Sequence, residues 1–246
     1  MKKLNLILIA FLGIFAIQGA NITGNEILKR ADENMTSETK VVVASMIVHG
    51  RRAVRKFKFK SWIMGTEKSF TEFLAPPRER GTKMLKIKKQ LWLYSPSADR
   101  VILIAGHMLR QSMMGSDLSY EDTLEDPKLH NLYNAEIIGE ETYLDRPCWV
   151  LKLTAKVKDV AYFSRKVWVD KEHFLILKEE MYARSGRLLK IAYVKEVKKL
   201  NGRWVATRAV FKDILKKGKG TEFIIENIKF DVKIPPYVFS KASLRK

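Results

Sequence analysis

The sequence from 188 to 207 reads LLKIAYVKEVKKLNGRWVAT and gives the clearest structural signal in the chain. Apolar residues recur around Ile191 and again around Val205, interspersed with polar ones, which is typical of β-strands with one covered face. Between the two runs stands Asn201-Gly202, a dipeptide that favours the tight turn of a β-hairpin because both residues adopt positive φ at low cost. The stretch therefore predicts two antiparallel strands joined by a two-residue turn.

The chain on either side of this hairpin repeats the pattern. Downstream of Ala135, the other strand-like runs of a meander centre on Ile137, Leu151, Val167, Leu177 and Ile225. Upstream, strand-like runs cover 40–49, 56–60, 68–74, 82–88, 90–94 and 100–104. Around ten or eleven antiparallel strands in sequence predict one large curved sheet, open or closed. The expected fold class is therefore mainly β (α+β), a large antiparallel sheet with a few helices.

Two segments predict helices that could cover this sheet. In 23–36, Thr23 and Glu26 have the spacing of a capping box. Apolar residues of this segment recur every four positions on one helical face: Ile27, Ala31 and Met35. The segment 107–134 predicts a loop with one or two short helices, because Ser119 and Asp122 repeat the capping spacing. An apolar sheet face must be covered, so the space beneath these segments is either a filled core or a partly lidded hydrophobic groove.

Composition and charge limit the classes of partner. Of the 246 residues, 46% are hydrophobic, and no long linker divides them, which predicts one domain with a sizeable core. Lys and Arg outnumber Asp and Glu by 46 to 27, and the net charge of +19 favours anionic partners, an anionic membrane surface among them.

Residues 1–20 have the pattern of a secretory signal peptide. Lys2 and Lys3 precede an apolar run that ends at Gly19-Ala20. We therefore expect export, removal of 1–20, and a single mature domain at 21–246 with two lysines fewer; a retained N-terminal anchor is the alternative. No cysteine follows the apolar run, so the mature N-terminus is not lipidated. The prediction is a periplasmic monomer that does not meet nucleic acid.

The sequence shows no recognisable catalytic or metal-binding motif. Four histidines lack the paired spacing of metal ligands: His49, His107, His130 and His173. Cys148 is the only cysteine, so it forms no internal disulfide and is expected to be a small buried hydrophobe. The acidic residues within 117–126 lack the spacing of a calcium loop and are expected to form a solvated helix face. We expect no enzyme, no cofactor and no metal.

Methionines and aromatic residues indicate where an apolar ligand could bind. The candidate lid consists of flexible apolar side chains and one tyrosine: Met108, Met113, Met114, Leu118 and Tyr120. The candidate groove lining consists of Trp62, Phe70 and Trp92, and the candidate head-group contacts near strand ends are Arg78, Arg80 and Arg100. The plainer alternatives are core-filling methionines and solvated arginines.

Five blocks of sequence follow one another in order along the chain: 80–85 (RGTKML), 91–94 (LWLY), 99–102 (DRVI), 114–122 (MGSDLSYED) and 146–151 (RPCWVL). Together they resemble one known family, the outer-membrane lipoprotein-sorting proteins. The resemblance implies a LolA/LolB-like fold, in which an antiparallel sheet curls into an unclosed half-barrel and helices form a lid over an apolar cavity. It also implies binding of the acyl chains of lipids or lipidated proteins. The absence of a lipidation cysteine favours the carrier over the membrane-anchored receptor.

Three functions remain in view. The first is a periplasmic carrier that takes a lipid or lipoprotein from an inner-membrane donor to an outer-membrane acceptor. The second is a sensor or interaction module that binds lipidated or unfolded envelope proteins and signals to a membrane partner. The third is a peripheral protein that binds anionic lipid through its charge alone, which salt would weaken.

Overall fold

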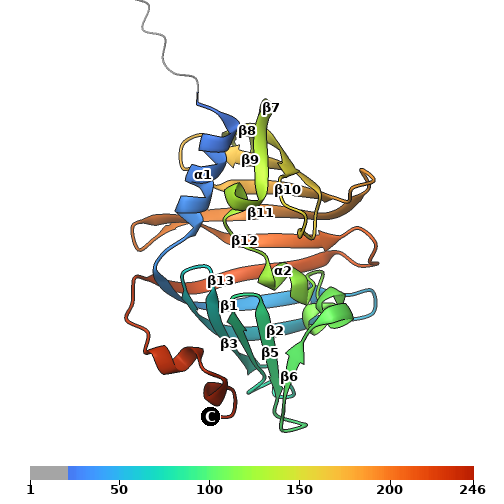
Figure 1. Ribbon diagram of the computed structural model, residues 1–246, viewed down its shortest axis with the longest axis vertical. Coiled ribbons are helices and arrows are strands. Elements are labelled where there is room, and N and C mark those ends of the chain that lie inside the picture. Colours follow the sequence, from blue (N-terminus) through green and yellow to red (C-terminus); the bar gives the residue numbers. More distant parts are fainter. Residues whose placement is uncertain (1–21) are drawn as a thin grey trace, which may run out of the picture.

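The computed structural model describes residues 22–246, so the expected signal peptide at 1–20 lies outside the described residues. Its framework is one antiparallel sheet of 13 strands (Figure 1). The first six strands are β1 (Thr39–His49), β2 (Val54–Met64), β3 (Lys68–Ala75), β4 (Lys83–Ile87), β5 (Gln90–Ser95) and β6 (Arg100–Ile104). The other seven are β7 (Tyr133–Tyr143), β8 (Arg146–Ala155), β9 (Ser164–Asp170), β10 (Ile176–Tyr182), β11 (Leu188–Leu200), β12 (Arg203–Asp213) and β13 (Gly220–Phe230).

Every strand pairs with its neighbours in sequence, except that β6 does not pair with β7. The order across the sheet is β6-β5-β4-β3-β2-β1-β13-β12-β11-β10-β9-β8-β7, so β1 pairs with β13 at the centre and the two halves of the meander fan out from them. Each predicted run forms a strand of its own, and the expected number of ten or eleven was therefore too low. The β11–β12 turn has φ 49° at Asn201 and φ 81° at Gly202, which confirms the predicted hairpin.

The sheet curls but does not close. Register shifts interrupt the ladders at Val43/Ala44 in β1, at Ile137/Gly139 in β7 and at several places in β10 and β11. Such bulges increase local twist and bend a strand, which curves a long sheet. The edge strands β6 and β7 do not pair with each other. The unclosed half-barrel of the expected fold class is therefore confirmed.

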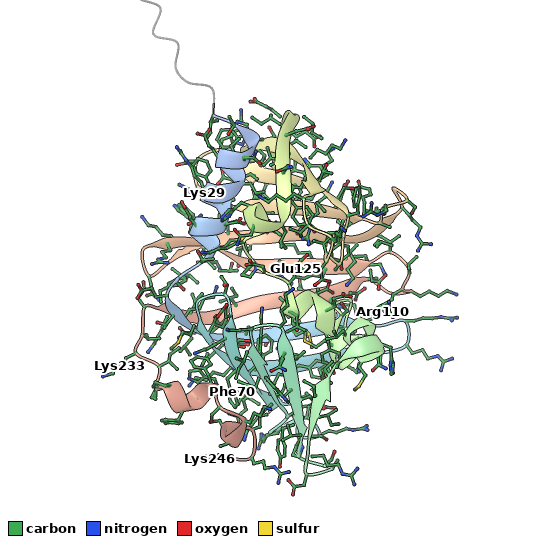
Figure 2. All side chains as sticks on the ribbon, in the orientation of Figure 1. Lys29, Phe70, Arg110, Glu125, Lys233 and Lys246 are labelled. Carbon is green, nitrogen blue, oxygen red and sulfur yellow. The ribbon has the colours of Figure 1, made fainter. Side chains whose placement is uncertain are left out.

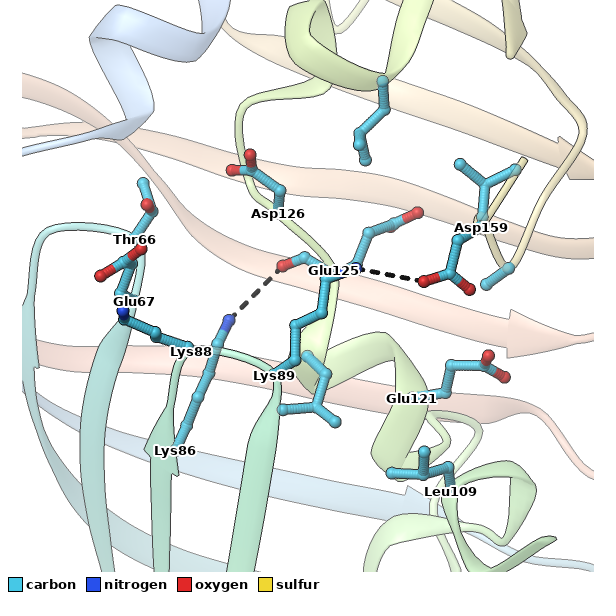
Figure 3. Close-up of a pocket in the computed structure, with 14 residues that line it drawn as sticks. Thr66, Glu67, Lys86, Lys88, Lys89, Leu109, Glu121, Glu125, Asp126 and Asp159 are labelled. Carbon is cyan, nitrogen blue, oxygen red and sulfur yellow. Dashed lines mark hydrogen bonds and ion pairs between the residues drawn. The ribbon is translucent and has the colours of Figure 1, made fainter. Parts of the chain in front are cut away.

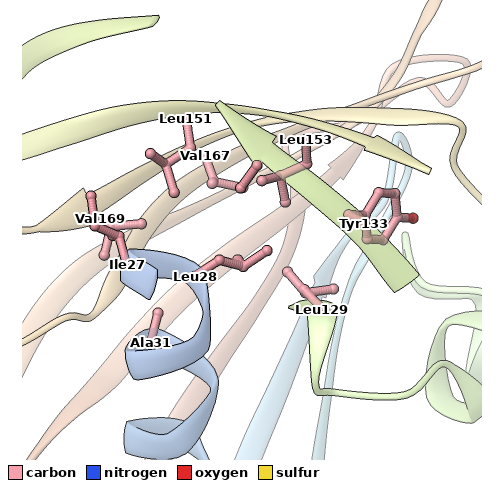
Figure 4. Packing of buried hydrophobic residues seen from close by; sticks show 10 residues of the cluster. Ile27, Leu28, Ala31, Leu129, Tyr133, Leu151, Leu153, Val167 and Val169 are labelled. Carbon is pink, nitrogen blue, oxygen red and sulfur yellow. The ribbon is translucent and has the colours of Figure 1, made fainter. Parts of the chain in front are cut away.

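Helix α1 (Gly24–Met35) covers one half of the sheet. The Thr23 side chain accepts from the Glu26 amide and the Glu26 carboxylate accepts from the Thr23 amide, which confirms the predicted capping box. Ile27 and Ala31 are fully buried against β7, β8 and β9 (Figure 4). The third residue of the expected apolar face, Met35, is 48% exposed, because the helix ends there beyond the strands that it covers.

A second segment covers the other half on the same face, which we call the inner face. It contains two 3₁₀ helices, η1 (Gly106–Arg110) and η2 (Met113–Gly115), followed by α2 (Tyr120–Leu124) and α3 (Leu129–Leu132). The Ser119–Asp122 capping box at the start of α2 forms as predicted. We call residues 106–132 the lid segment. It packs on an apolar cluster built from β1 to β6.

The C-terminal segment covers the opposite, outer face. After β13 the chain forms η3 (Pro236–Phe239) and η4 (Lys241–Leu244), at the lower left of Figure 1. Ile234, Phe239 and Leu244 pack against side chains of β2 to β5. Both faces of these strands are therefore buried, the inner one under the lid segment and the outer one under the C-terminal segment.

Candidate functional site: a covered cavity on the inner face

A large cavity lies between α1, the lid segment and the inner face of the central strands. It has a volume of about 510 Å³, and we call it the central chamber. Apolar side chains line much of it: Ile63, Leu129, Ile176, Leu177, Ala192, Val194, Ala206, Ala209 and Phe211. Small residues on β11 and β12 leave the space that larger ones would fill. The central chamber therefore combines an apolar wall with charged groups, among them Asp122, Glu125 and Arg165.

A second cavity of about 200 Å³ lies beneath the lid segment, and we call it the lid chamber. Its apolar lining is Met46, Phe59, Phe73, Met84, Leu91, Met113, Leu118 and Phe223. Met113 and Leu118 come from the lid segment, and the others come from β1 to β5 and β13. Flexible thioethers suit a surface that accepts apolar chains of varied shape.

The two chambers meet at three polar side chains. Ser69, Thr123 and Lys86 line both of them. Lys86 also lines a third cavity of about 350 Å³ on the other side of Glu125, shown in Figure 3. Lys86 thus lines all three cavities.

Buried ion pairs join the lid segment to the sheet. Arg165 of β9 is 4% exposed and donates to Glu125 of the lid segment and, at 2.6 Å, to Glu179 of β10. Its guanidinium lies 4.9 Å from the ring centre of Tyr133 and 5.1 Å from that of Tyr162. Burial alone would lower the pKa of Arg165, but the two carboxylates hold it well above its ordinary value. Arg165 is therefore a permanent cation.

A second ion pair lies one helical turn earlier in the lid segment. The Lys190 ammonium of β11 contacts the Asp122 carboxylate, which also accepts from the Tyr162 hydroxyl at 2.5 Å. Burial alone would raise the pKa of Asp122, but Lys190 and Tyr162 hold it below the ordinary value of 3.8. Ion pairs thus connect the lid segment to strands β9 and β11. Figure 2 shows Glu125 at the middle of the molecule, between the two halves of the sheet.

The structure places the predicted lid residues together. Met113 and Leu118 line the lid chamber, while Met108, Met114 and Tyr120 pack in the same apolar cluster. The segment covers the sheet as expected. Whether these residues bind a ligand stays a prediction.

The predicted groove lining differs from the observed one. Trp62, Phe70 and Trp92 pack together on the outer face, in the cluster that the C-terminal segment covers. Their sequence neighbours Ile63, Ser69 and Leu91 line the inner cavities instead. Successive side chains of a strand point to opposite faces, so a shift of one position exchanges the two sets.

The predicted head-group arginines lie away from the cavities. Arg78 and Arg80 stand in the β3–β4 connection, where Arg80 donates to the main-chain oxygen of Leu74, and Arg100 begins β6. None of the three lines a cavity described above. Six lysines and one arginine do line them: Lys40, Lys68, Lys86, Lys88, Lys89, Lys178 and Arg165. Lys86 and Arg165 are the buried residues of this set. Neither carried a signal in the sequence, because each is one of two or more basic residues in a strand-like run and its partners are distant along the chain.

The cysteine and part of the acidic cluster are buried. The expected solvated face is wrong for Asp122 and Glu125, because their carboxylates form the buried ion pairs described above. Cys148 is fully buried, and burial raises the pKa of its thiol to about 11. Within residues 22–246 no group of three His, Cys, Asp or Glu residues could hold a metal ion. In the same part of the chain, no helix combines the length and apolar character that crossing a membrane requires.

Solved structures share this architecture. A DUF1329 family protein from Desulfovibrio piger is 26% identical, with a TM-score of 0.82 over 90% of this chain and 97% of that one. A LolA superfamily protein from Nitrosomonas europaea is also 26% identical, with a TM-score of 0.73 over 90% and 99%. A putative outer membrane lipoprotein-sorting protein domain from Vibrio parahaemolyticus is 24% identical, with a TM-score of 0.78 over 91% and 98%. No curated protein matches the chain by sequence.

The open half-barrel, its lid and its apolar chambers define a protein of the LolA-like class, which confirms the resemblance seen in the sequence. A family model with the description "Uncharacterized protein" matches residues 65–246, more than half of the chain. The chain belongs to that family.

Proposed function

We propose that this protein is a non-enzymatic periplasmic carrier that holds acyl chains of a lipid or lipidated protein in its inner chambers and takes part in lipoprotein sorting. The observation that carries the proposal is the pair of adjoining apolar chambers under a lid segment. A filled core would leave no such space. The names of the neighbours from Nitrosomonas europaea and Vibrio parahaemolyticus point in the same direction.

The energetics suit reversible binding. Burial of an acyl chain contributes roughly 0.8 kcal/mol per CH₂, so a chain of about 14 to 16 carbons gains on the order of 10 kcal/mol. Part of this gain is offset when the ion pairs Asp122–Lys190 and Glu125–Arg165 separate as the lid segment moves. A carrier needs this balance, because it has to release its cargo.

Native mass spectrometry of residues 21–246, purified without detergent and followed by lipid extraction, tests the proposal directly. A retained adduct that extracts as phospholipid or acylated peptide is the expected result. Protein that stays empty after incubation with lipid and with lipopeptide contradicts the carrier function and favours the interaction module.

A cavity-filling variant locates the site. Ala192 lies on β11 in the wall of the central chamber, and Ala192→Trp is expected to abolish adduct retention while the protein still folds. Ala98→Trp, at an exposed turn between β5 and β6, is the matched control. Equal retention in both variants would place the ligand outside the central chamber.

A further inference from the structure

Lys86 is an unusual cation in this molecule. It lies on β4, it is 9% exposed, and its side chain points into the cavities. The other deeply buried cations on the inner face, Arg165 and Lys190, each contact a carboxylate. Among residues 22–246, the Lys86 ammonium has one hydrogen-bond partner, the main-chain oxygen of Glu125 at 3.5 Å, and it forms no ion pair (Figure 3).

A buried ammonium with one long hydrogen bond is costly. An ammonium group has three donors, and burial without a counter-charge disfavours its charged form. Burial accordingly lowers the pKa of Lys86, and the charges of Asp126 and Glu125 only partly oppose this effect. The site is therefore short of an anion.

The surroundings show what else such an anion would meet. The hydroxyls of Ser69 and Thr123 line the junction of the central and lid chambers together with Lys86. The Ser69 hydroxyl can donate to a carboxylate or phosphate oxygen, whereas the Thr123 hydroxyl already donates to the main-chain oxygen of Tyr120 at 2.7 Å. Beyond this polar junction the lid chamber has a mainly apolar lining, and the central chamber offers apolar side chains of β10 to β12 together with ionic groups such as Glu125 and Arg165. The arrangement suits a molecule with an acidic group at the junction and a hydrocarbon chain in a chamber.

We propose that Lys86, with Ser69, binds the carboxylate or phosphate group of an anionic amphiphile whose acyl chain occupies the adjoining chambers. The inference rests on the proposed carrier function and narrows its ligand to amphiphiles with an acidic group. The acidic group supplies the missing counter-charge. The anion thus gains a charge-assisted hydrogen bond that a neutral amphiphile of the same length lacks.

The chain offers a matched control for Lys86. Lys83 lies three residues earlier on β4 and is 8% exposed, but its ammonium lies 5.8 Å from the ring centre of Tyr94 and lines none of the cavities. Lys86→Met and Lys83→Met therefore remove the same charge from the same strand at the same depth. Lys86→Gln keeps a polar group at the junction and serves if the methionine variant does not fold.

Calorimetric titration with dodecyl phosphate, dodecyl maltoside and inorganic phosphate tests the assignment. The wild type is expected to bind dodecyl phosphate more tightly than dodecyl maltoside. Lys86→Met is expected to lower the affinity for dodecyl phosphate about tenfold to a hundredfold and to leave the affinity for dodecyl maltoside unchanged. Lys83→Met is expected to bind all three as the wild type does.

The other outcomes separate the two proposals. If Lys86→Met binds dodecyl phosphate as tightly as the wild type, or if Lys83→Met loses as much, the role of Lys86 is overturned. Inorganic phosphate that binds as tightly as dodecyl phosphate would mean a site for the free anion. Equal wild-type affinity for both amphiphiles overturns the acid selectivity but leaves the carrier intact. If the wild type binds neither amphiphile, the carrier function itself fails.

Discussion

Replacement of Arg165 by methionine is expected to be the most damaging single charge removal in the molecule. The guanidinium holds the Glu125 and Glu179 carboxylates together in a site where Arg165 is 4% exposed. Arg165→Met keeps most of the apolar stem but leaves two neighbouring carboxylates without their cation. Breaking a buried pair by removing one partner costs about 3–5 kcal/mol, since the remaining charge stays buried. For a chain of this size that corresponds to a fall in melting temperature of roughly 6–20 °C.

Urea unfolding followed by tryptophan fluorescence gives the measurement. Arg203→Met is the control, because the Arg203–Asp231 pair is half-exposed and its loss costs at most about 1 kcal/mol. Burial raises the pKa of Glu125, even though Arg165 opposes the effect, so this carboxyl takes up a proton readily as the pH falls. A protonated carboxyl group needs no counter-charge. The loss of unfolding free energy caused by Arg165→Met should therefore be smaller at about pH 5 than at about pH 8.

Two results would refute this reasoning. One is a loss of unfolding free energy no larger than that of Arg203→Met. The other is a deficit that does not change with pH. A triple variant that also carries Glu125→Gln and Glu179→Gln should recover much of the stability, because replacing a whole buried ionic group is often close to neutral.

Three further changes test other parts of the structure. Asp122→Asn should lower the free energy of unfolding by about 1.5–3 kcal/mol at neutral pH. Because the pKa of Asp122 is held below 3.8, this difference in free energy of unfolding should be present above pH 3.8 and disappear as the pH falls through the pKa of the folded protein. A difference that remains in acid would contradict the ion pair with Lys190. Gly24→Ala should destabilise the protein despite alanine's higher helix propensity, since its Cβ would lie 2.5 Å from the Ala135 carbonyl oxygen, whereas Gly139→Ala meets nothing within 4 Å and should be tolerated in thermal melts. Leu244→Ala should cost about 2–5 kcal/mol, because this residue is fully buried in the outer-face cluster, and an unchanged melting temperature would show that the C-terminal segment is dispensable.

Local patterns were sufficient for the elements of this fold. The strand runs, the Asn201-Gly202 turn and the capping boxes at Thr23 and Ser119 depend on residues within a few positions of one another. Strand periodicity and turn chemistry act over this same range. The class of the fold, a meandering antiparallel sheet with a few covering helices, was therefore accessible without coordinates.

Local patterns did not predict which face of each strand lines the cavities. Strands β2 to β5 carry apolar side chains on both faces, because the lid segment covers one and the C-terminal segment covers the other. Periodicity then offers no choice between Trp92 and Leu91 as the residue that lines the cavity. Only the docking of η3 and η4 assigns Trp62, Phe70 and Trp92 to the outer face.

The sequence by itself determined the strands, the turns, the helix caps and thereby the class of fold, since each of these elements depends on neighbours along the chain. Tertiary structure alone decided the site. It brought Glu125 to Arg165 across 40 positions and Asp122 to Lys190 across 68. It also buried Lys86 where the chambers meet, with no carboxylate partner among residues 22–246. The energy of a charge depends on its burial and on what lies within a few ångströms, and both are set only when distant segments pack together.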